Sequence, residues 1–154
     1  MSLNLDTTHS SVEFSVRHMG LATVRGRFED FTVDAEVNEQ GEPTRLSAVI
    51  DAASINTGTA DRDQHLRSAD FFDVETYPTI TFESKNIERE GDEYVIEGDL
   101  TIRGVTKPAT FEAEVSDFVK DPWGNPRLAA EATGKINRTD WGLTWNQVLE
   151  AGSL

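Results

Sequence analysis

The sequence predicts an all-β protein, built as an antiparallel sandwich or barrel with one short helix. Most segments alternate apolar and polar residues with a period of two, which is typical of strands with one buried and one solvated face. Turn-forming residues separate these segments and no helices alternate with them, which argues against a parallel α/β sheet. The chain has 154 residues, of which 37% are hydrophobic, so residues 1–154 are expected to form a single domain with a modest core.

The first strands are expected close to the N-terminus. Apolar residues occupy the even positions over residues 11–18, and the odd positions over residues 31–37. Residues 24–28 keep the even parity, so the parity changes at Glu29 and Asp30. A β-bulge or a sharp bend is expected there, because either device shifts which residues face inward.

Further strands and one helix complete the predicted order. The strands are expected over residues 46–52, 80–82, 94–102, 109–115 and 128–136. Residues 104–108 are expected to form a turn-like link, and residues 121–126, which are dense in Pro, Gly and Asn, a second turn. The helix is expected from Ala60 to Asp70, because this stretch does not alternate and follows Gly58 and Thr59.

The predicted inner faces mix large and very small side chains. Three phenylalanines are interspersed with small residues, which are Ala35, Ala48, Gly98, Ala113, Ala130, Ala132 and Gly134. Small residues on an inward face could leave an apolar lumen with room for an apolar ligand. Alternatively, they lie opposite the large side chains, and the core is filled. The pattern alone leaves both interpretations open.

Charge and residue types exclude several classes of function. Fourteen Lys and Arg stand against 28 Asp and Glu, a net charge of −14, which argues against nucleic acid as a partner and against anionic membranes. No apolar run approaches the roughly 20 residues of a membrane-spanning helix, so no integral membrane segment is expected. The absence of cysteine excludes disulfides and thiolate sites. The chain begins without a signal-peptide pattern, so we expect a cytoplasmic protein, or a periplasmic one if a leader was removed.

The sequence offers no strong catalytic motif. His9, His18 and His65 come from separate segments without metal-ligand spacing, and neither a nucleophile elbow nor a phosphate-binding glycine loop occurs. We therefore expect no metal, no cofactor and no enzymatic activity. His18 is either a polar anchor at the end of an inward face or a strand-end residue. Four charged residues of the predicted helix, Arg62, Asp63, His65 and Arg67, could form a polar lid or an anchor for a ligand head group. Alternatively, Arg62 and Asp63 tie the helix to the barrel rim through ion pairs.

A series of motifs, in order over nearly the whole chain, resembles those of the YceI-like family. The motifs include VRHMG at residues 16–20, RGRF at 25–28, RDQHLRS at 62–68, YPTITFES at 77–84, GDLTIRGVTKP at 98–108 and NRTDWG at 137–142. The resemblance implies an extended lipocalin-like antiparallel β-barrel with one short helix and a long hydrophobic pore. It also implies non-enzymatic binding of a polyisoprenoid, such as a prenyl quinone-like lipid, or of another long-chain amphiphile, for carriage, storage or sensing.

The resemblance, combined with strand parity, assigns candidate ligand-contacting residues. The apolar candidates for the pore lining are Phe14, Val16, Phe28, Phe82, Leu100, Ile102 and Phe111. The polar candidates near an opening are His18, Arg25, Arg62 and His65. Selectivity for tail length is then expected from the depth of the pore, and selectivity for the head group from the polar residues at its mouth.

The sequence also departs from the family pattern at its end. That pattern continues with a further strand beyond residues 149–152, whereas this sequence ends at Leu154. A missing strand would leave a sheet edge that a second copy could cover, so we hypothesise a homodimer. Two rival functions stay open. One is a stress-related protein-interaction module with a filled pore, and the other is an enzyme acting on an isoprenoid lipid, with His18 or His65 as acid or base.

Overall fold

The structure, a computed structural model, describes residues 2–4, 10–18, 22–115, 119–120, 122–123, 126–127 and 130–143. Its strands are β1 Ser2–Asn4, β2 Val12–His18, β3 Ala22–Phe28, β4 Phe31–Val37, β5 Pro43–Asp51, β6 Ile55–Asn56, β7 Thr79–Glu90, β8 Glu93–Ile102, β9 Val105–Val115, β10 Val119–Lys120, β11 Pro126–Arg127 and β12 Ala130–Thr133. Its helical segments are the 3₁₀ turns η2 Ala52–Ser54 and η3 Arg138–Trp141 and the α-helix α1 Ala60–Arg67.

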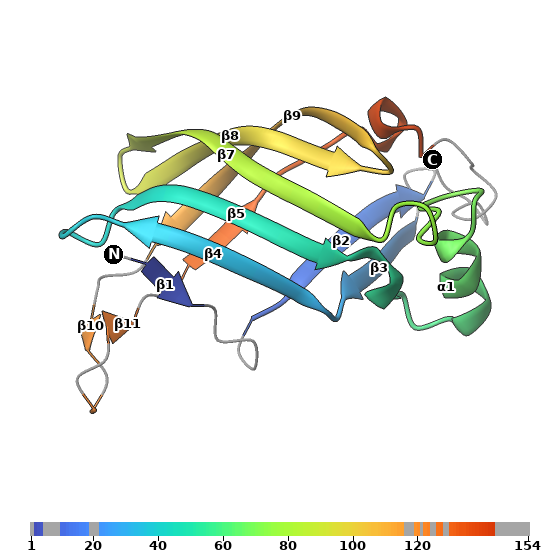
Figure 1. The fold of residues 1–154 in the computed structure, drawn as a ribbon, viewed down its shortest axis with the longest axis horizontal. Coiled ribbons are helices and arrows are strands. Elements are labelled where there is room, and N and C mark those ends of the chain that lie inside the picture. The colour runs from blue at the N-terminus through green and yellow to red at the C-terminus, as the bar shows by residue number, and fades with distance from the viewer. Residues whose placement is uncertain are drawn as a thin grey trace.

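Seven of the described strands form one curled antiparallel sheet, in the order β1-β4-β5-β7-β8-β9-β12 (Figure 1). Strands β2, β3 and β6 form a second sheet, and β10 and β11 form a separate hairpin. Among the described residues no ladder joins β1 to β12, so the main sheet is a half-barrel. The predicted all-β class, the antiparallel arrangement and the single short helix are confirmed.

The expected change of parity after Phe28 corresponds to a bend between two sheets. Strand β3 ends at Phe28 in the smaller sheet, and β4 begins at Phe31 in the main sheet. The backbone bends at Glu29 and Asp30. The prediction of a bend is therefore confirmed, and the bend passes the chain from one sheet to the other.

The expected turn-like link over residues 104–108 is wrong. The turn between β8 and β9 consists of Arg103 and Gly104, both with positive φ, and the ladder resumes at Val105. Pro108 lies within β9, although proline cannot donate a ladder hydrogen bond. Strand β12 pairs only with residues 112–115 of β9, so Pro108 needs no donor on that side.

The predicted helix is shorter at its C-terminal end than expected. It begins at Ala60 as predicted but ends at Arg67, because Ser68 turns away from the helix. The backbone N–H and the hydroxyl of Ser68 both donate to the carbonyl oxygen of His65, at 3.0 and 2.6 Å. This local bonding replaces the next helical turn.

Most of the core lies at the end of the main sheet that carries α1. Its largest buried side chains include Phe28, Ile55, Leu66, Phe71, Phe72, Ile80, Phe82, Leu100, Ile102, Trp141 and Leu143. Phe72 makes edge contacts with Phe28 and Phe71, with ring centroids 6.0 and 5.0 Å apart. Segments on both sides of the half-barrel thus contribute to one apolar cluster that closes this end.

Candidate functional site

The strand register aligns apolar side chains on the inner face of the main sheet. Residues directly opposite each other in antiparallel strands point to the same face. One such row runs from Ala48 through Phe82 to Leu100. A second row, nearer the turn between β7 and β8, runs from Ile87 through Ile96 to Phe111.

Burial along this inner face is uneven. In the rows nearest α1, Ile80 and Ile102 are buried. Farther from α1, Tyr94 and Ile96 on β8, Ala113 on β9 and Val37 on β4 are buried as well. Other inward apolar side chains there are only half-buried or, on the edge strand β12, exposed. We call this set the open apolar face, and its members are Val33, Ala35, Leu46, Ala48, Ile87, Phe111, Val115, Ala130 and Ala132. These side chains form an apolar surface that the rest of the described structure covers only in part.

Phenylalanine rings cover three glycines of the predicted inner faces. A Cβ atom at Gly26 would lie 2.5 Å from Phe14 Cζ, and one at Gly134 would lie 2.7 Å from Phe111 Cδ1. Gly98 likewise lies beneath the ring of Phe82. At these positions the small residue accommodates a large one, so the filled-core interpretation holds there. The alanines of the open apolar face are different, because they are half-buried or exposed.

The apolar candidates fall into two groups. Those buried within the core are Phe28, Phe82, Leu100 and Ile102. Those half-buried at its margin are Phe14, Val16 and Phe111. Phe14 packs on Phe28 with ring centroids 5.5 Å apart, and Phe111 packs edge-on against Phe82 at 5.1 Å. All seven lie in or against one apolar cluster, and their contact with a ligand stays a prediction.

The polar candidates lie on three different elements. Arg62 Nε donates to Thr57 Oγ1 at 2.9 Å, and Arg62 Nη2 donates to the carbonyl oxygen of Thr57 at 3.1 Å. His65 Nε2 lies 3.1 Å from Asp70 Oδ2. Arg25 is exposed on β3, and the side chain of His18 lies outside the described residues. Arg62 and His65 therefore serve the local structure around α1, and the role of all four toward a head group stays a prediction.

Hydrogen bonds tie α1 to the segment that precedes it. Asp63, only 6% exposed, accepts hydrogen bonds from the backbone N–H and the hydroxyl of Thr57. Arg67 donates to the carbonyl oxygens of Ala53 and Ile55 at 2.8 and 3.1 Å. Of the two alternatives for these charges, the tie to the neighbouring segment is present. It is made by hydrogen bonds to residues 53–57, in place of the ion pairs predicted for Arg62 and Asp63.

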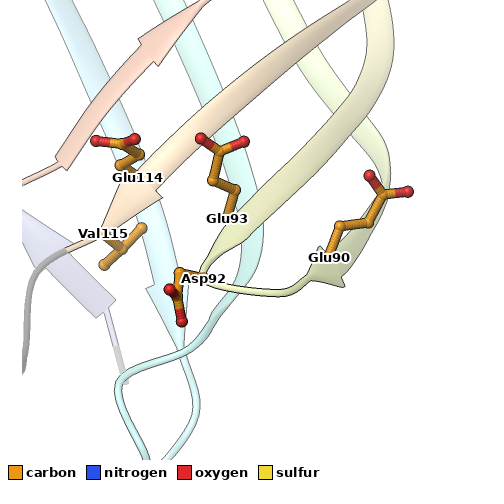
Figure 2. A pocket seen from close by; sticks show the side chains of 5 residues that line it. All are labelled: Glu90, Asp92, Glu93, Glu114 and Val115. Carbon is orange, nitrogen blue, oxygen red and sulfur yellow. The ribbon is translucent and has the colours of Figure 1, made fainter.

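A row of four glutamates crosses the outer face of the main sheet. The register places Glu90, Glu93, Glu114 and Glu131 opposite one another on β7, β8, β9 and β12. The first three line an open pocket with Asp92 and Val115 (Figure 2). The hydrogen bond between Glu93 and Glu114 raises the pKa of Glu93 above its ordinary value. Desolvation and the neighbouring negative charges act in the same direction.

Two features of this part of the molecule could not be predicted from the sequence, namely the glutamate row and the exposure of Trp123. The glutamate row was counted only as part of a large acidic total, because its alignment depends on the register of four strands. Trp123 was placed in a turn, but nothing indicated that 81% of it would be exposed. The signal available was its position between Pro122 and Gly124, at the centre of a turn-forming run.

The described part of the chain contains neither a cluster of metal-ligating side chains nor a helix that could cross a membrane. There, no three His, Asp or Glu side chains are placed to hold a metal ion. No helix among the same residues has the length and apolar character needed to cross a membrane.

Comparison with known proteins identifies related sequences and folds. The model of the YceI-like domain family matches residues 3–154. Protein YceI of Escherichia coli O157:H7 is 40% identical over 136 residues, which cover 88% of this chain and 71% of that protein. The solved structure of the YCEI protein of Campylobacter jejuni is 30% identical, with a TM-score of 0.78 over 97% of this chain and 90% of that one.

A third similarity shows the fold alone. A domain of Saccharophagus degradans, described as polyisoprenoid-binding and implicated in plant cell wall breakdown, has a TM-score of 0.63 at 18% identity, over 96% of this chain and 83% of that one. The two chains therefore share a fold despite their low identity. Because the family model spans nearly the whole chain and the E. coli relative matches most of it, this chain belongs to the YceI-like domain family.

Proposed function

We propose that the protein is a non-enzymatic binding protein whose ligand is a polyisoprenoid or another long-chain amphiphile. The observation that carries the proposal is the open apolar face. Residues such as Leu46, Ala48 and Phe111 belong to the inner side of the sheet by register, yet they are only half-buried. An apolar chain lying on them would complete the burial that the described residues leave incomplete.

The energetics favour a long apolar ligand over a compact polar one. Each buried CH₂ group contributes about 0.8 kcal/mol, so a chain of many carbons gains affinity without directional contacts. The Saccharophagus domain with a similar fold is described as polyisoprenoid-binding, which supports the same ligand class here. Because Ile80 and Ile102 are already buried next to α1, the ligand is expected on the half-buried side chains of the open apolar face.

Native mass spectrometry of the freshly purified protein, followed by extraction and lipid identification, tests the proposal. We expect a stoichiometric prenyl or long-acyl species. A protein that is empty and also fails to bind added prenyl quinone would overturn the proposal, and the protein-interaction module would become the better explanation.

Two neighbouring residues of β5 provide a matched pair of blocking variants. Ala48 points to the inner face opposite Phe82, whereas Val49 is 45% exposed on the outer face. Ala48→Phe is expected to fill the space above the open apolar face and abolish lipid binding. Val49→Phe adds comparable bulk outside and is expected to bind normally. Circular dichroism confirms that both variants fold, and equal binding by both would contradict the assignment of the inner face.

A further inference from the structure

We propose that the hairpin of β10 and β11 docks the protein onto an electrically neutral, zwitterionic lipid surface, with Trp123 as the anchor. The inference rests on the proposed function, because it names the surface from which the ligand enters. Its support comes from the exposure of Trp123, the place of the hairpin in the fold and the distribution of charge around it.

Trp123 is the most exposed large hydrophobic residue in the described part of the chain. It is 81% exposed, whereas Val49 and Ile136 are 45% and 43% exposed. It lies in the turn of a short hairpin in which Val119 pairs with Arg127. Indole combines a large apolar ring with one N–H donor, and tryptophan is enriched where membrane meets water for that reason.

The hairpin stands clear of the main sheet, at the end of the molecule opposite α1 (Figure 1). In the chain it connects β9 to β12. These strands carry Val115, Ala130 and Ala132 of the open apolar face beside the points where the chain leaves and rejoins the sheet. A membrane held by Trp123 would therefore meet the edge of the sheet at which Ala130 and Ala132 of the open apolar face are exposed.

The charge at the same end of the sheet selects the type of lipid surface. Glu90, Asp92, Glu93 and Glu114 gather around the turn between β7 and β8 (Figure 2). The whole chain carries a net charge of −14. Such a surface is repelled by anionic lipid at distances up to the Debye length. A neutral surface carries no such repulsion, so the anchor can act there.

Cosedimentation of the full chain with phosphatidylcholine vesicles tests the proposal. Wild type is expected to bind, and Trp123→Ala is expected to weaken binding about tenfold, the factor that corresponds to partial burial of one large apolar side chain. Trp123→Phe should retain most of the binding. Val49→Ala, which removes another exposed apolar side chain, should change it little. Vesicles containing phosphatidylglycerol should bind less well at low salt and recover as salt is added.

The same variants separate this proposal from the proposed function. Farnesol, a short prenyl alcohol added without vesicles, reports ligand binding alone, and Trp123→Ala should bind it as wild type does. If farnesol binds but neutral vesicles do not, the docking proposal is wrong and the binding function stands. If vesicles bind through Trp123 but farnesol does not, the binding function fails instead. Equal vesicle binding by wild type and Trp123→Ala, or a preference for anionic vesicles, would also overturn the docking proposal.

Discussion

The indole N–H of Trp141 donates to the carbonyl oxygen of Leu100 at 2.9 Å, although 41 residues separate them in the chain. Both side chains are buried, at 3% and 7% exposure. The bond joins η3 to β8 and places the large indole ring in the core near α1. The closed end of the half-barrel therefore depends on a segment that follows all the strands described here.

Trp141→Phe should destabilise the fold while keeping most of the apolar volume. The variant removes one hydrogen bond to the buried carbonyl oxygen of Leu100, which costs about 0.5–1.5 kcal/mol. Urea denaturation measures the difference. Trp123→Phe serves as the control, because Trp123 is exposed, and its effect should stay within about 0.5 kcal/mol. Equal effects of the two substitutions would show that the bond to Leu100 contributes little.

Asp63→Ala should destabilise the protein more than Asp61→Ala. Both residues lie in the first turn of α1, where a carboxylate favours the helix by about 0.3–1 kcal/mol. Only Asp63 is buried, and only its removal leaves the N–H and hydroxyl of Thr57 without their acceptor, which adds about 1–3 kcal/mol. Thermal unfolding of the two variants side by side measures the difference. Similar losses would mean that Thr57 finds another partner or water.

The strand pattern could be predicted from the sequence wherever the alternation is local and uninterrupted. Strand β4, expected over residues 31–37, has those bounds in the structure. Strand β7 was expected only over residues 80–82 but extends to Glu90. A register shift between Ser84 and Asn86 moves the inward positions from even to odd residues, so Ile87 no longer matched the pattern. Bulges of this kind arise from pairing with another strand, which a single segment does not reveal.

The candidate site could be predicted only in part, for a related reason. Parity placed Phe82 and Phe111 on an inward face, and the structure agrees. Parity does not show which inward residues are then covered by other segments. Coverage separates buried Phe82 from half-buried Phe111, and it depends on where α1, η3 and the smaller sheet pack. The exposure of Trp123 likewise follows from the position of a whole hairpin.

Two of the three glycines beneath phenylalanine rings, Gly26 and Gly98, should respond differently when the ring above them is made smaller. A methyl group at Gly26 would meet only side chains, Phe14 Cζ at 2.5 Å and Thr57 Cγ2 at 2.9 Å, whereas one at Gly98 would also meet the carbonyl oxygen of Glu83. Each Gly→Ala substitution should destabilise by about 1–3 kcal/mol. Phe14→Leu should relieve the first, with a coupling of about 1 kcal/mol in a double-mutant cycle.

Phe82→Leu should relieve Gly98→Ala much less, because the backbone of β7 cannot move aside without breaking the ladder. Chemical denaturation of the single and double variants gives both couplings. A large coupling between Gly98→Ala and Phe82→Leu would show that the backbone of β7 shifts easily. That result would contradict the claim that the backbone, and not only the ring of Phe82, restricts the space at Gly98.

Glu93→Gln should stabilise the protein at neutral pH and change it little in acid. The hydrogen bond with Glu114 and the surrounding negative charges raise the pKa of Glu93 in the folded state. Between its ordinary value, about 4.3, and the raised one, the folded state binds more protons than the unfolded state. Stability therefore falls as pH rises through that window. Glutamine keeps a hydrogen-bonding side chain without the charge, so the variant should lose this part of the pH dependence.

Glu97→Gln is the matched control, since Glu97 lies on the same outer face of β8 but opposite Thr110 and Asn86, which carry no charge. Melting temperatures at about pH 4 and about pH 8, on either side of the expected window, measure the effect. We expect Glu93→Gln to melt above wild type at the higher pH only, and Glu97→Gln to follow wild type at both. A lower melting temperature for Glu93→Gln at the higher pH would mean that Glu93 makes a net favourable contribution as a charged group, against the repulsion expected from the glutamate row.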